Sequence, residues 1–348
     1  MQATRIAPLL SAPPASAFPQ WPFGWYFALN SNQVTRTPVG FELFGRNLVC
    51  FRSSSGKPVT MEAHCWHLGA DLSRGSLIDS RIVCPFHGWR YSESGDCVHI
   101  PCQAEIPSFA RQRTYCTTEF AGRIFVFPAP QSAYPLPFFP DTDPADLLAA
   151  PAFEFLIDCP WWLVGANGFD LQHFAKSHDR RITNRPLIET PVPAARRIRV
   201  TFEVCGTDWR DHATRQFAGR YVTLDATVWS GTLAFVISRF HKSPDSGSWR
   251  SATYGMTEIR PVPSAPDKQS IVRVTIFCRH HKGLAPVDWL AVRLKRDFVH
   301  AFLKPDTLLL RGAQYDPDHL IDADRQLVDY LRWLALASRN HFTTEEPL

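Results

Sequence analysis

The feature that most restricts how this chain can fold is a pair of short Cys/His segments. Cys65 and His67 are separated by one residue, whereas Cys84 and His87 are separated by two. Thiolate and imidazole groups are soft metal ligands, and four of them in two clips form a plausible ligand set. The pattern therefore predicts two loops that together present a metal site.

Two kinds of metal site use two sulfurs and two nitrogens. Zinc clips usually separate their Cys ligands by two to four residues and bind a single ion. In a Rieske [2Fe-2S] cluster, one iron takes two sulfurs and the other takes two nitrogens. The one-residue and two-residue spacings favour the cluster, with zinc as the alternative.

The segments around these clips have the composition of short strands. Apolar and β-branched runs separated by turn residues occupy residues 41–52, 80–91, 97–100 and 122–128. Residues 129–144 are rich in proline, which cannot propagate a helix or a central strand. We expect an N-terminal extension at 1–20, a β domain at 21–130, a linker at 131–145 and a second domain at 146–348.

The second domain combines helical and strand patterns. Helical spacing occurs at residues 161–178, and two C-terminal helices are expected at 287–311 and 322–338. Five consecutive strand patterns lie between them, at 196–206, 220–229, 231–240, 248–259 and 270–281. This order predicts an antiparallel sheet with helices.

Composition narrows the class of protein. The 348 residues carry a net charge of +4, which is too small to indicate a nucleic-acid partner. No apolar run is long enough to span a membrane, and the N-terminal segment is too rich in proline for a signal peptide. Nine cysteines in a long chain do not suggest a disulfide framework. We expect a cytoplasmic protein in which Cys50, Cys97, Cys102, Cys116 and Cys159 are small buried apolar residues rather than ligands.

A second group of candidate ligands lies about 80 residues beyond the first. Asn167, Asp170 and His173 follow one another at i, i+3 steps, which places them on one face of a helix. His178 lies about 140° from that face, because five residues advance an α-helix by about 500°. It can share an ion with His173 only if the helix ends there or widens into a π-turn.

The two groups together resemble the Rieske non-haem iron oxygenases of the ring-hydroxylating type. The resemblance rests on HCWHLGADL and CPFHGWRYSESGDC, with Gly69 and Gly88 in the turns, and on the spacing N-x2-D-x2-H-x4-H. The Rieske segments are most similar to the aminopyrrolnitrin oxygenase type, which oxidises an arylamine at nitrogen, and more distantly to sterol-directed members. The resemblance implies a β Rieske domain followed by an α+β helix-grip (START-like) domain with a curved antiparallel sheet.

The family takes the third ligand of its mononuclear Fe(II) from a carboxylate near the C-terminus. Six residues compete here: Asp297, Asp306, Asp316, Asp318, Asp322 and Asp324. Helical phase favours Asp306, which lies within the apolar stripe that includes Phe302 and Leu310, where an unpaired carboxylate is costly. The alternative is that Asp306 is an exposed residue after a kink at Pro305.

The resemblance also implies how the chain acts. Cys65, His67, Cys84 and His87 hold the [2Fe-2S] cluster, and His173, His178 and Asp306 hold Fe(II), with Asn167 beside them. Asp170 links an iron-ligating His to a cluster-ligating His of the neighbouring subunit, which requires a homotrimer; its alternative role is to orient His173 alone. Such a chain is the terminal oxygenase of a system in which electrons from NAD(P)H arrive through a ferredoxin or flavin reductase.

The expected reaction is O2-dependent C-hydroxylation or N-oxygenation of a small aromatic or hydrophobic compound. Demethylation and desaturation are alternatives within the family, and an electron carrier or a helix-grip ligand-binding protein are alternatives outside it. Aromatic residues of the second domain are core more often than pocket wall. They include Trp161, Trp162, Phe169, Phe174, Trp229 and Phe235.

Overall fold

The computed structural model describes residues 11–244, 248–280 and 285–339, and it divides into two units. One unit comprises residues 24–136, and the other comprises residues 1–23 together with 137–348. Residues 1–10 of the expected N-terminal extension and His281 of the last expected strand lie outside the described residues. No helix in the described ranges has both the length and the hydropathy of a membrane span.

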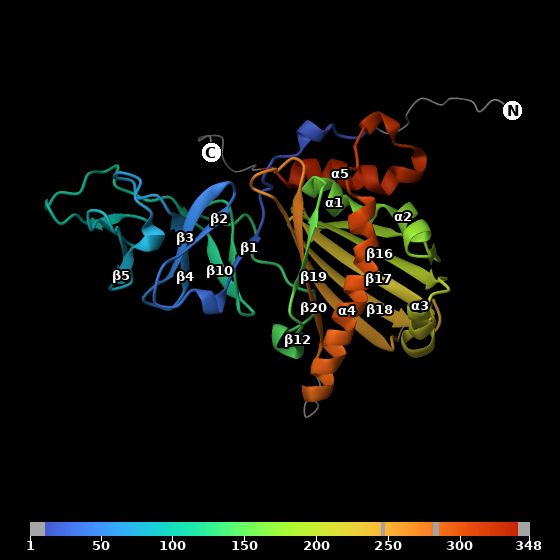
Figure 1. Ribbon diagram of the computed structural model, residues 1–348. Coiled ribbons are helices and arrows are strands. Elements are labelled where there is room, and N and C mark those ends of the chain that lie inside the picture. Colours follow the sequence, from blue (N-terminus) through green and yellow to red (C-terminus); the bar gives the residue numbers. More distant parts are fainter. Residues whose placement is uncertain (1–10, 245–247, 281–284, 340–348) are drawn as a thin grey trace. The chain divides into compact units, whose positions relative to one another are not determined.

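The smaller unit is built from three antiparallel sheets (Figure 1). A three-stranded sheet has the order β1(Tyr26–Asn30), β11(Arg123–Val126), β10(Thr117–Phe120). A four-stranded sheet has the order β2(Val39–Leu43), β3(Arg46–Arg52), β4(Pro58–Glu62), β9(Thr114–Tyr115). A second four-stranded sheet has the order β5(Ser76–Ile78), β6(Arg81–Val83), β7(Arg90–Tyr91), β8(Cys97–His99). The last of these sheets carries Cys84 and His87 on the turn from β6 to β7.

The larger unit is organised around one antiparallel nine-stranded sheet. Its main path has the order β12(Leu147–Ala149), β20(Ser270–Arg279), β19(Ser251–Pro261), β18(Leu233–His241), β17(Tyr221–Trp229), β16(Ala195–Val204), β14(Arg180–Ile182). Two further strands pair with this path, β13(Phe153–Ile157) with β20 and β15(Leu187–Val192) with β16. The strands alternate in polarity: Val222 and Leu224 of β17 face a cavity, whereas Asp225 points to the opposite face and pairs with Arg197 and Arg199.

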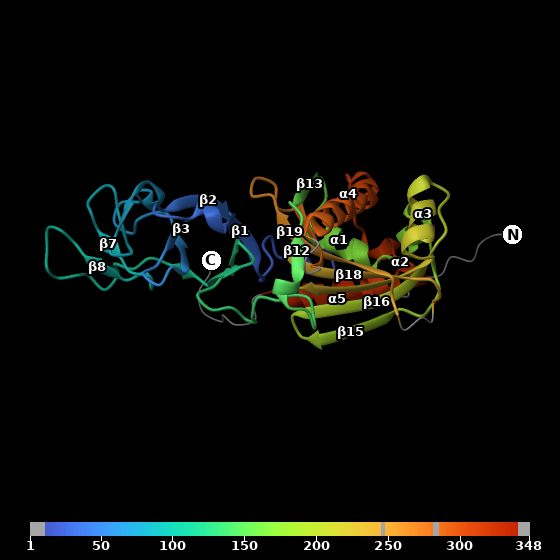
Figure 2. The same cartoon turned by 90° about the horizontal axis from the view of Figure 1, so that it is seen from below.

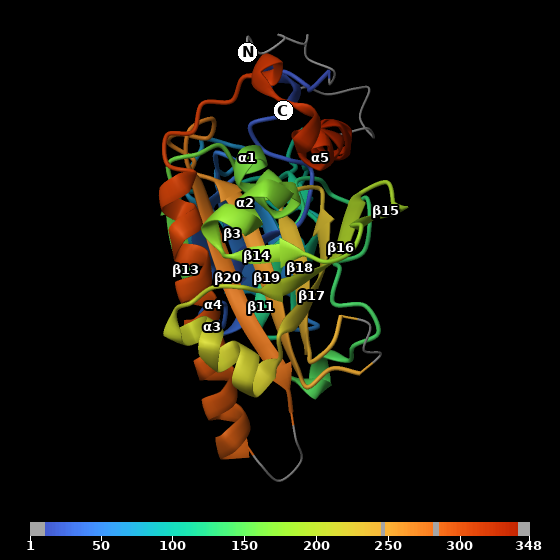
Figure 3. The same cartoon turned by 90° about the vertical axis from the view of Figure 1, so that its right-hand side faces the viewer.

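Helices cover the face of the sheet to which Val222 and Leu224 belong. The long helix α4(Ala285–Leu309) lies along this face, and α3(Trp209–Ala213) stands on the same side (Figures 2 and 3). The apolar stripe of α4 explains its orientation, because Phe298, Val299, Phe302 and Leu303 all point toward the strands. The helix continues through Pro305 and ends four residues later, so the two expected C-terminal helices are α4 and α5(Arg325–Ala337).

The opposite face of the sheet is covered in part by the proline-rich segment. Phe138 and Phe139 follow Pro137, and both rings make edge contacts with Phe235 of β18 and Phe277 of β20. A segment that cannot form a strand of its own thus buries aromatic surface against the sheet. The fold class predicted from the sequence, a β domain followed by a long helix packed on an antiparallel sheet, is confirmed.

Candidate metal centres

The two Cys/His segments form loops that are closed in the same way. The Cys65 N–H donates to the Ala70 carbonyl and the Gly69 N–H donates to the Cys65 carbonyl, at 2.9 and 2.8 Å. In the second loop, Cys84 and Gly88 repeat this pattern at 2.8 and 3.0 Å. Gly69 and Gly88 have φ angles of 72° and 70°, a left-handed conformation that is costly for residues with a Cβ. The glycine in each motif is therefore required by the turn.

The loops separate the sulfur ligands from the nitrogen ligands. Cys65 and Cys84 are buried, at 2% and 3% exposure, whereas His67 and His87 are exposed. The two imidazole rings lie beside each other, with centroids 4.8 Å apart, and His67 stacks on Trp89 at 4.6 Å. Thiols on the inner side and imidazoles on the solvent side fit a cluster in which one iron takes both sulfurs and the other both nitrogens.

A hydrogen bond to sulfur that the sequence did not reveal comes from Tyr91. Its hydroxyl donates to the Cys65 Sγ over 3.1 Å, and the ring is fully buried. Burial raises the pKa of the Cys65 thiol, and the Tyr91 hydrogen bond acts in the opposite direction. A buried tyrosine usually finds a partner for its hydroxyl. Tyr91, which lies in the strand that directly follows the second clip, was therefore the signal in the sequence for this hydrogen bond.

The helical segment at 161–178 is not one helix, which corrects the expectation that Asn167, Asp170 and His173 share a helix face. It consists of α1(Trp161–Ala166), a 3-10 turn η5(Asn167–Phe169) and α2(Leu171–Ser177). Asp170 lies between the turn and α2 with φ −80° and ψ 93°, outside the helical region. Its carboxylate accepts hydrogen bonds from the backbone N–H groups of Gln172 and His173 at 3.1 and 3.4 Å. Asp170 thus acts as the N-cap of α2.

Helix α2 ends immediately before His178, the second histidine of the motif. His178 is the C-terminal cap of α2, with φ −121° and ψ 3°, so it leaves the helical path. Of the two routes that the sequence allowed, an end to the helix or a π-turn, the structure takes the first. The Arg180 guanidinium donates to the His178 carbonyl at 2.6 Å and thereby holds this end of the helix.

His173, His178 and Asp306 converge on one point. One potential ligand atom from each lies within 4.8 Å of the other two, and the His178 Nε2 is 3.0 Å from the Asp306 Oδ1. Both of these atoms are buried and neither makes a hydrogen bond within the described ranges. Buried polar atoms are rarely left without a partner, and a metal ion between them would satisfy both. The donor set is the one that non-haem Fe(II) oxygenases use, two His and one carboxylate, so the residues fit such an ion.

The ring of His173 is oriented by the backbone carbonyl of Asp170. Its Nδ1–H donates to the Asp170 carbonyl at 2.5 Å, which leaves Nε2 directed toward the other two ligands. Burial lowers the pKa of His173, and this favours the neutral imidazole that metals bind. Asp170 therefore holds His173 through its backbone carbonyl and caps α2 with its side chain, rather than contacting the imidazole with its carboxylate.

Asp306 is buried, at 8% exposure, as its helical phase predicts, and the alternative of an exposed residue after a kink is wrong. Asn167 joins it to one histidine, since the Asn167 Nδ2 lies 3.3 Å from the Asp306 Oδ2 and 3.5 Å from the His173 Nε2. Other candidate carboxylates have partners elsewhere. They include Asp297 with Arg296, Asp316 at the N-cap of a 3-10 turn, Asp322 with Arg325, and Asp324 with Gln172.

A buried ion pair between Arg180 and Asp211 stabilises the chain next to His178. Arg180 of β14 makes two hydrogen bonds of 2.8 Å to Asp211 of α3, and both side chains are at most 10% exposed. Asp211 approaches the backbone so closely that a Cβ at Gly206 would lie 2.0 Å from its Oδ2. This pair fixes the guanidinium that holds the His178 carbonyl.

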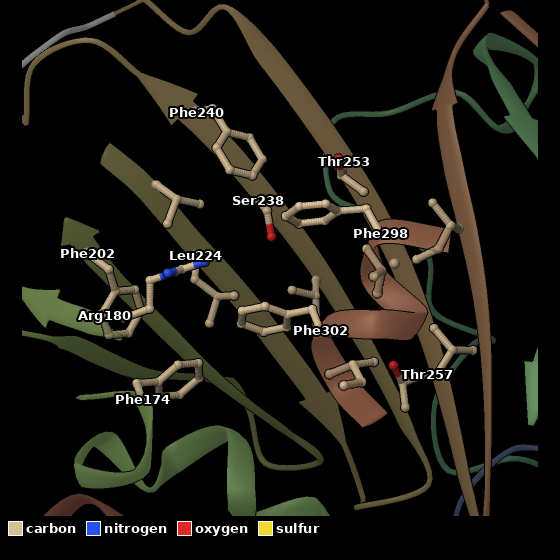
Figure 4. Close-up of a pocket in the computed structure, with 17 residues that line it drawn as sticks. Phe174, Arg180, Phe202, Leu224, Ser238, Phe240, Thr253, Thr257, Phe298 and Phe302 are labelled. Carbon is tan, nitrogen blue, oxygen red and sulfur yellow. The ribbon is translucent and has the colours of Figure 1, made fainter. Parts of the chain in front are cut away.

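An apolar cavity of about 170 Å³ lies between α4 and the sheet (Figure 4), and two of the residues that line it contact the rings of the candidate ligands His173 and His178. The Phe302 ring stacks on His178 with centroids 4.0 Å apart, and Phe174 contacts the His173 ring at 4.2 Å. Both phenylalanines line the cavity. Of the aromatic residues named from the sequence, Phe174 lines it, whereas Trp161, Trp162 and Phe169 belong to the core.

All nine cysteines are described and none forms a disulfide. Cys50, Cys97 and Cys159 are buried as expected, but Cys102 is exposed and Cys116 is half-buried.

Comparison with known proteins agrees with this geometry. Residues 24–110 match the family described as the Rieske [2Fe-2S] domain. The aminopyrrolnitrin oxygenase PrnD of Pseudomonas fluorescens is 38% identical over 164 residues, which cover 44% of this chain and 45% of PrnD. The oxygenase component of a 3-ketosteroid-9-alpha-monooxygenase of Rhodococcus rhodochrous is 36% identical over 115 residues, 33% of this chain and 30% of the relative. The match therefore spans less than half the length of these curated relatives.

Solved structures extend the likeness to most of the chain. Dicamba monooxygenase bound to dicamba superposes with a TM-score of 0.59 at 16% identity, over 90% of this chain and 97% of the other. Pseudomonas putida NdmA, as a mutant with caffeine, gives 0.65 at 17% identity, over 90% and 89%. Residues 24–110 therefore match a Rieske [2Fe-2S] domain, and the chain shares its fold with these two solved structures. The resemblance seen in the sequence is confirmed for the Rieske domain by the family match and for the fold by the solved structures.

Proposed function

We propose that this chain is the terminal oxygenase of a Rieske non-haem iron system. The observation that carries the proposal is the convergence of His173, His178 and Asp306 beside an apolar cavity, in a chain that also carries a Rieske domain. An electron carrier has no need of three converging ligands. A ligand-binding protein has no need of a cluster.

The roles of the site residues follow from their chemistry. Cys65, His67, Cys84 and His87 hold the [2Fe-2S] cluster, which accepts and passes on one electron at a time. His173, His178 and Asp306 would hold Fe(II), which would supply the activation of dioxygen. Asn167 bridges two of these ligands and Asp170 orients His173, so both act as positioning residues.

The proposed reaction is O2-dependent C-hydroxylation or N-oxygenation of a small aromatic or hydrophobic compound. Electrons come from NAD(P)H through a separate ferredoxin or flavin reductase. The chain's residues bind the compound in the cavity and exclude water from it, since Phe174, Phe202 and Phe302 form much of the wall near the ligands. Desaturation is a second candidate, favoured by 32% identity over 173 residues to the cholesterol 7-desaturase nvd of Drosophila melanogaster.

We also propose a homotrimer in the cytoplasm. The imidazoles of His67 and His87 are exposed, and the apolar side chains around them are exposed as well. Trp66, Leu68 and Phe86 have exposures of 56%, 64% and 62%. An apolar surface at a redox site is suited to contact with another protein surface, and a neighbouring subunit would bring an iron centre close to the cluster. The nine cysteines form no disulfide in the structure, as is usual for cytoplasmic proteins.

Iron analysis and oxygen uptake test this function. Anaerobically purified protein should contain three irons and two acid-labile sulfides per chain, because the cluster holds two irons and the 2-His-1-carboxylate site holds one. With a surrogate reductase, NADH-dependent oxygen uptake should rise when a substrate is added, and His173→Ala should abolish the rise while the cluster spectrum remains. Bound zinc without inorganic sulfide would contradict the proposal.

A further inference from the structure

The cavity beside the candidate iron site is almost uniformly apolar, and its few polar groups stand out. Phenylalanine rings dominate the wall, contributed by the sheet, α2 and α4; they are Phe174, Phe202, Phe240, Phe298 and Phe302. Aromatic walls favour flat aromatic ligands, which stack against them or meet them edge-on. An engineered protein cavity of about 150 Å³ binds benzene. A cavity of about 170 Å³ is thus suited to one ring with short substituents.

The cavity offers no free charge. Among the residues that the structure describes, Arg180 is the one charged residue that lines it. Both terminal nitrogens of Arg180 are bonded to the Asp211 carboxylate at 2.8 Å, and one of them also reaches the His178 carbonyl. The buried pair neutralises itself. An ionised ligand would therefore lose its hydration without gaining a counter-charge, so the cavity disfavours both anions and cations.

Two hydroxyl groups mark one end of the cavity. Ser238 of β18 and Thr253 of β19 are direct cross-strand partners, so their side chains emerge next to each other on the same face. Neither hydroxyl makes a hydrogen bond within the described part of the chain. Figure 4 shows them at the end that holds Phe240 and Phe298, with Phe174 at the opposite end. Phe298 precedes Asp306 by eight residues, which is about 12 Å along the helix.

We propose that the cavity selects a neutral, single-ring aromatic compound whose hydrogen-bonding substituent is held by Ser238 and Thr253, away from the iron site. A hydroxyl both donates and accepts, so a carbonyl, amide or hydroxyl substituent can bind to the pair. One part of this assignment rests on the proposed function, namely which end of the ring reacts. The assignment also distinguishes this chain from relatives that are named for steroids. A steroid has four fused rings and is larger than this cavity.

Calorimetric binding to the iron-loaded protein tests the assignment without turnover. The probes are acetophenone, ethylbenzene as its analogue without an acceptor, benzoate as an anion, and androstenedione as a 3-ketosteroid. Acetophenone should bind roughly three- to tenfold more tightly than ethylbenzene, because a neutral hydrogen bond contributes about that much to affinity. Benzoate and androstenedione should bind most weakly.

Variants test the position of the polar end. The double variant Ser238→Ala/Thr253→Val should bind both neutral probes with equal affinity, with an unchanged unfolding temperature. Thr257→Val is the matched control, because Thr257 lines the same cavity further along β19, and it should keep the preference for acetophenone. A preference that survives the double variant, or that is lost in Thr257→Val, would overturn the assignment, and so would tighter binding of benzoate or androstenedione.

The binding test and the functional test fail in different ways. If the binding order holds but no bound compound stimulates oxygen uptake, the proposed function is wrong and the cavity assignment stands. If only the steroid stimulates oxygen uptake, the oxygenase function stands and the cavity assignment is wrong.

Discussion

Asp306 is a buried carboxylate within the apolar stripe of a helix, and its environment favours the proposed metal ion. A buried carboxylate that is not fully hydrogen-bonded is costly, and here the Oδ1 faces the Nε2 of His178, which likewise makes no hydrogen bond. An ion between them would offset the loss of hydration for both groups. Stability and function are therefore linked at this residue.

Replacing Asp306 separates the two metal sites. Asp306→Ala should keep the visible spectrum of the cluster but lose most of the mononuclear iron and all turnover, because two histidines alone hold the ion weakly. Iron analysis and optical spectra provide the measurement. The control is Asp297→Ala, since Asp297 is an exposed partner of Arg296 on the same helix. Loss of iron in the control rather than in Asp306→Ala would assign the carboxylate differently.

Tyr91 should raise the reduction potential of the cluster. Its hydroxyl donates to the Cys65 sulfur at 3.1 Å, and such a bond strengthens when reduction adds negative charge to the cluster. Tyr91→Phe should therefore lower the potential by on the order of 40 mV, since about 1 kcal/mol corresponds to that value for one electron. Spectroelectrochemistry measures it. Tyr115→Phe, which removes a hydroxyl that bonds Glu62, should leave the potential unchanged.

Asp170 combines a local and a proposed long-range role. Asn is as good an N-cap as Asp, so Asp170→Asn should keep α2 and both metals. The variant should nevertheless leave a pre-reduced cluster reduced when oxygen and substrate are added, because the charge of the bridge between subunits is lost. Single-turnover reoxidation, followed optically at confirmed iron occupancy, measures this. Reoxidation at the wild-type rate would limit Asp170 to orienting and capping.

At the scale of elements, the iron site depends on where helices stop. Helix α2 begins at its Asp170 cap and ends before His178, so two ligands that a continuous helix would separate face the same point. The Arg180–Asp211 pair between β14 and α3 then fixes the C-terminal end of α2. Helix α5 adds a further constraint, since Tyr330 stacks on Phe169 of the η5 turn at 4.1 Å.

Breaking the Arg180–Asp211 pair should weaken the candidate iron site, although neither residue is one of its three ligands. Asp211→Ala should destabilise the protein by about 3–5 kcal/mol, because it leaves a buried guanidinium without its counter-charge. It should also weaken iron binding, since the His178 carbonyl loses its anchored donor. Urea unfolding and iron retention during dialysis are the measurements. The exposed pair Arg325–Asp322 provides the control, and Asp322→Ala should cost less than about 1 kcal/mol. Equal effects in the two variants would contradict the anchoring role.

At the scale of the whole molecule, the exposed imidazoles and the apolar residues around them constitute a surface suited to association. Scattering measurements should give the mass of three chains, with the cluster intact. Leu68→Arg, which places a charge on the apolar surface, should reduce the mass to one chain and stop turnover while the cluster spectrum is retained. Exposed Leu187 on β15 lies in the other unit, and Leu187→Arg is the control. A wild-type mass of one chain with activity intact would exclude the trimer.

The sequence by itself predicted the fold class, through a family resemblance, and supplied the residues proposed for both ligand sets. Short motifs encode local chain geometry. This geometry determines the positive φ of Gly69 and Gly88 and the spacing of the four Cys and His residues, Cys65, His67, Cys84 and His87. Helical phase likewise identified Asp306 as the buried carboxylate, because the apolar stripe of α4 is a local property.

Only the tertiary structure decided how these residues meet. The partner of the Cys65 sulfur and the Arg180–Asp211 anchor both depend on groups brought together from segments separated in the sequence. The same holds for the cavity, whose wall combines β16 to β20 with α2 and α4. Periodicity describes a helix or strand relative to its own axis, whereas a pocket and the hydroxyl groups that line it are set by the packing of one element on another.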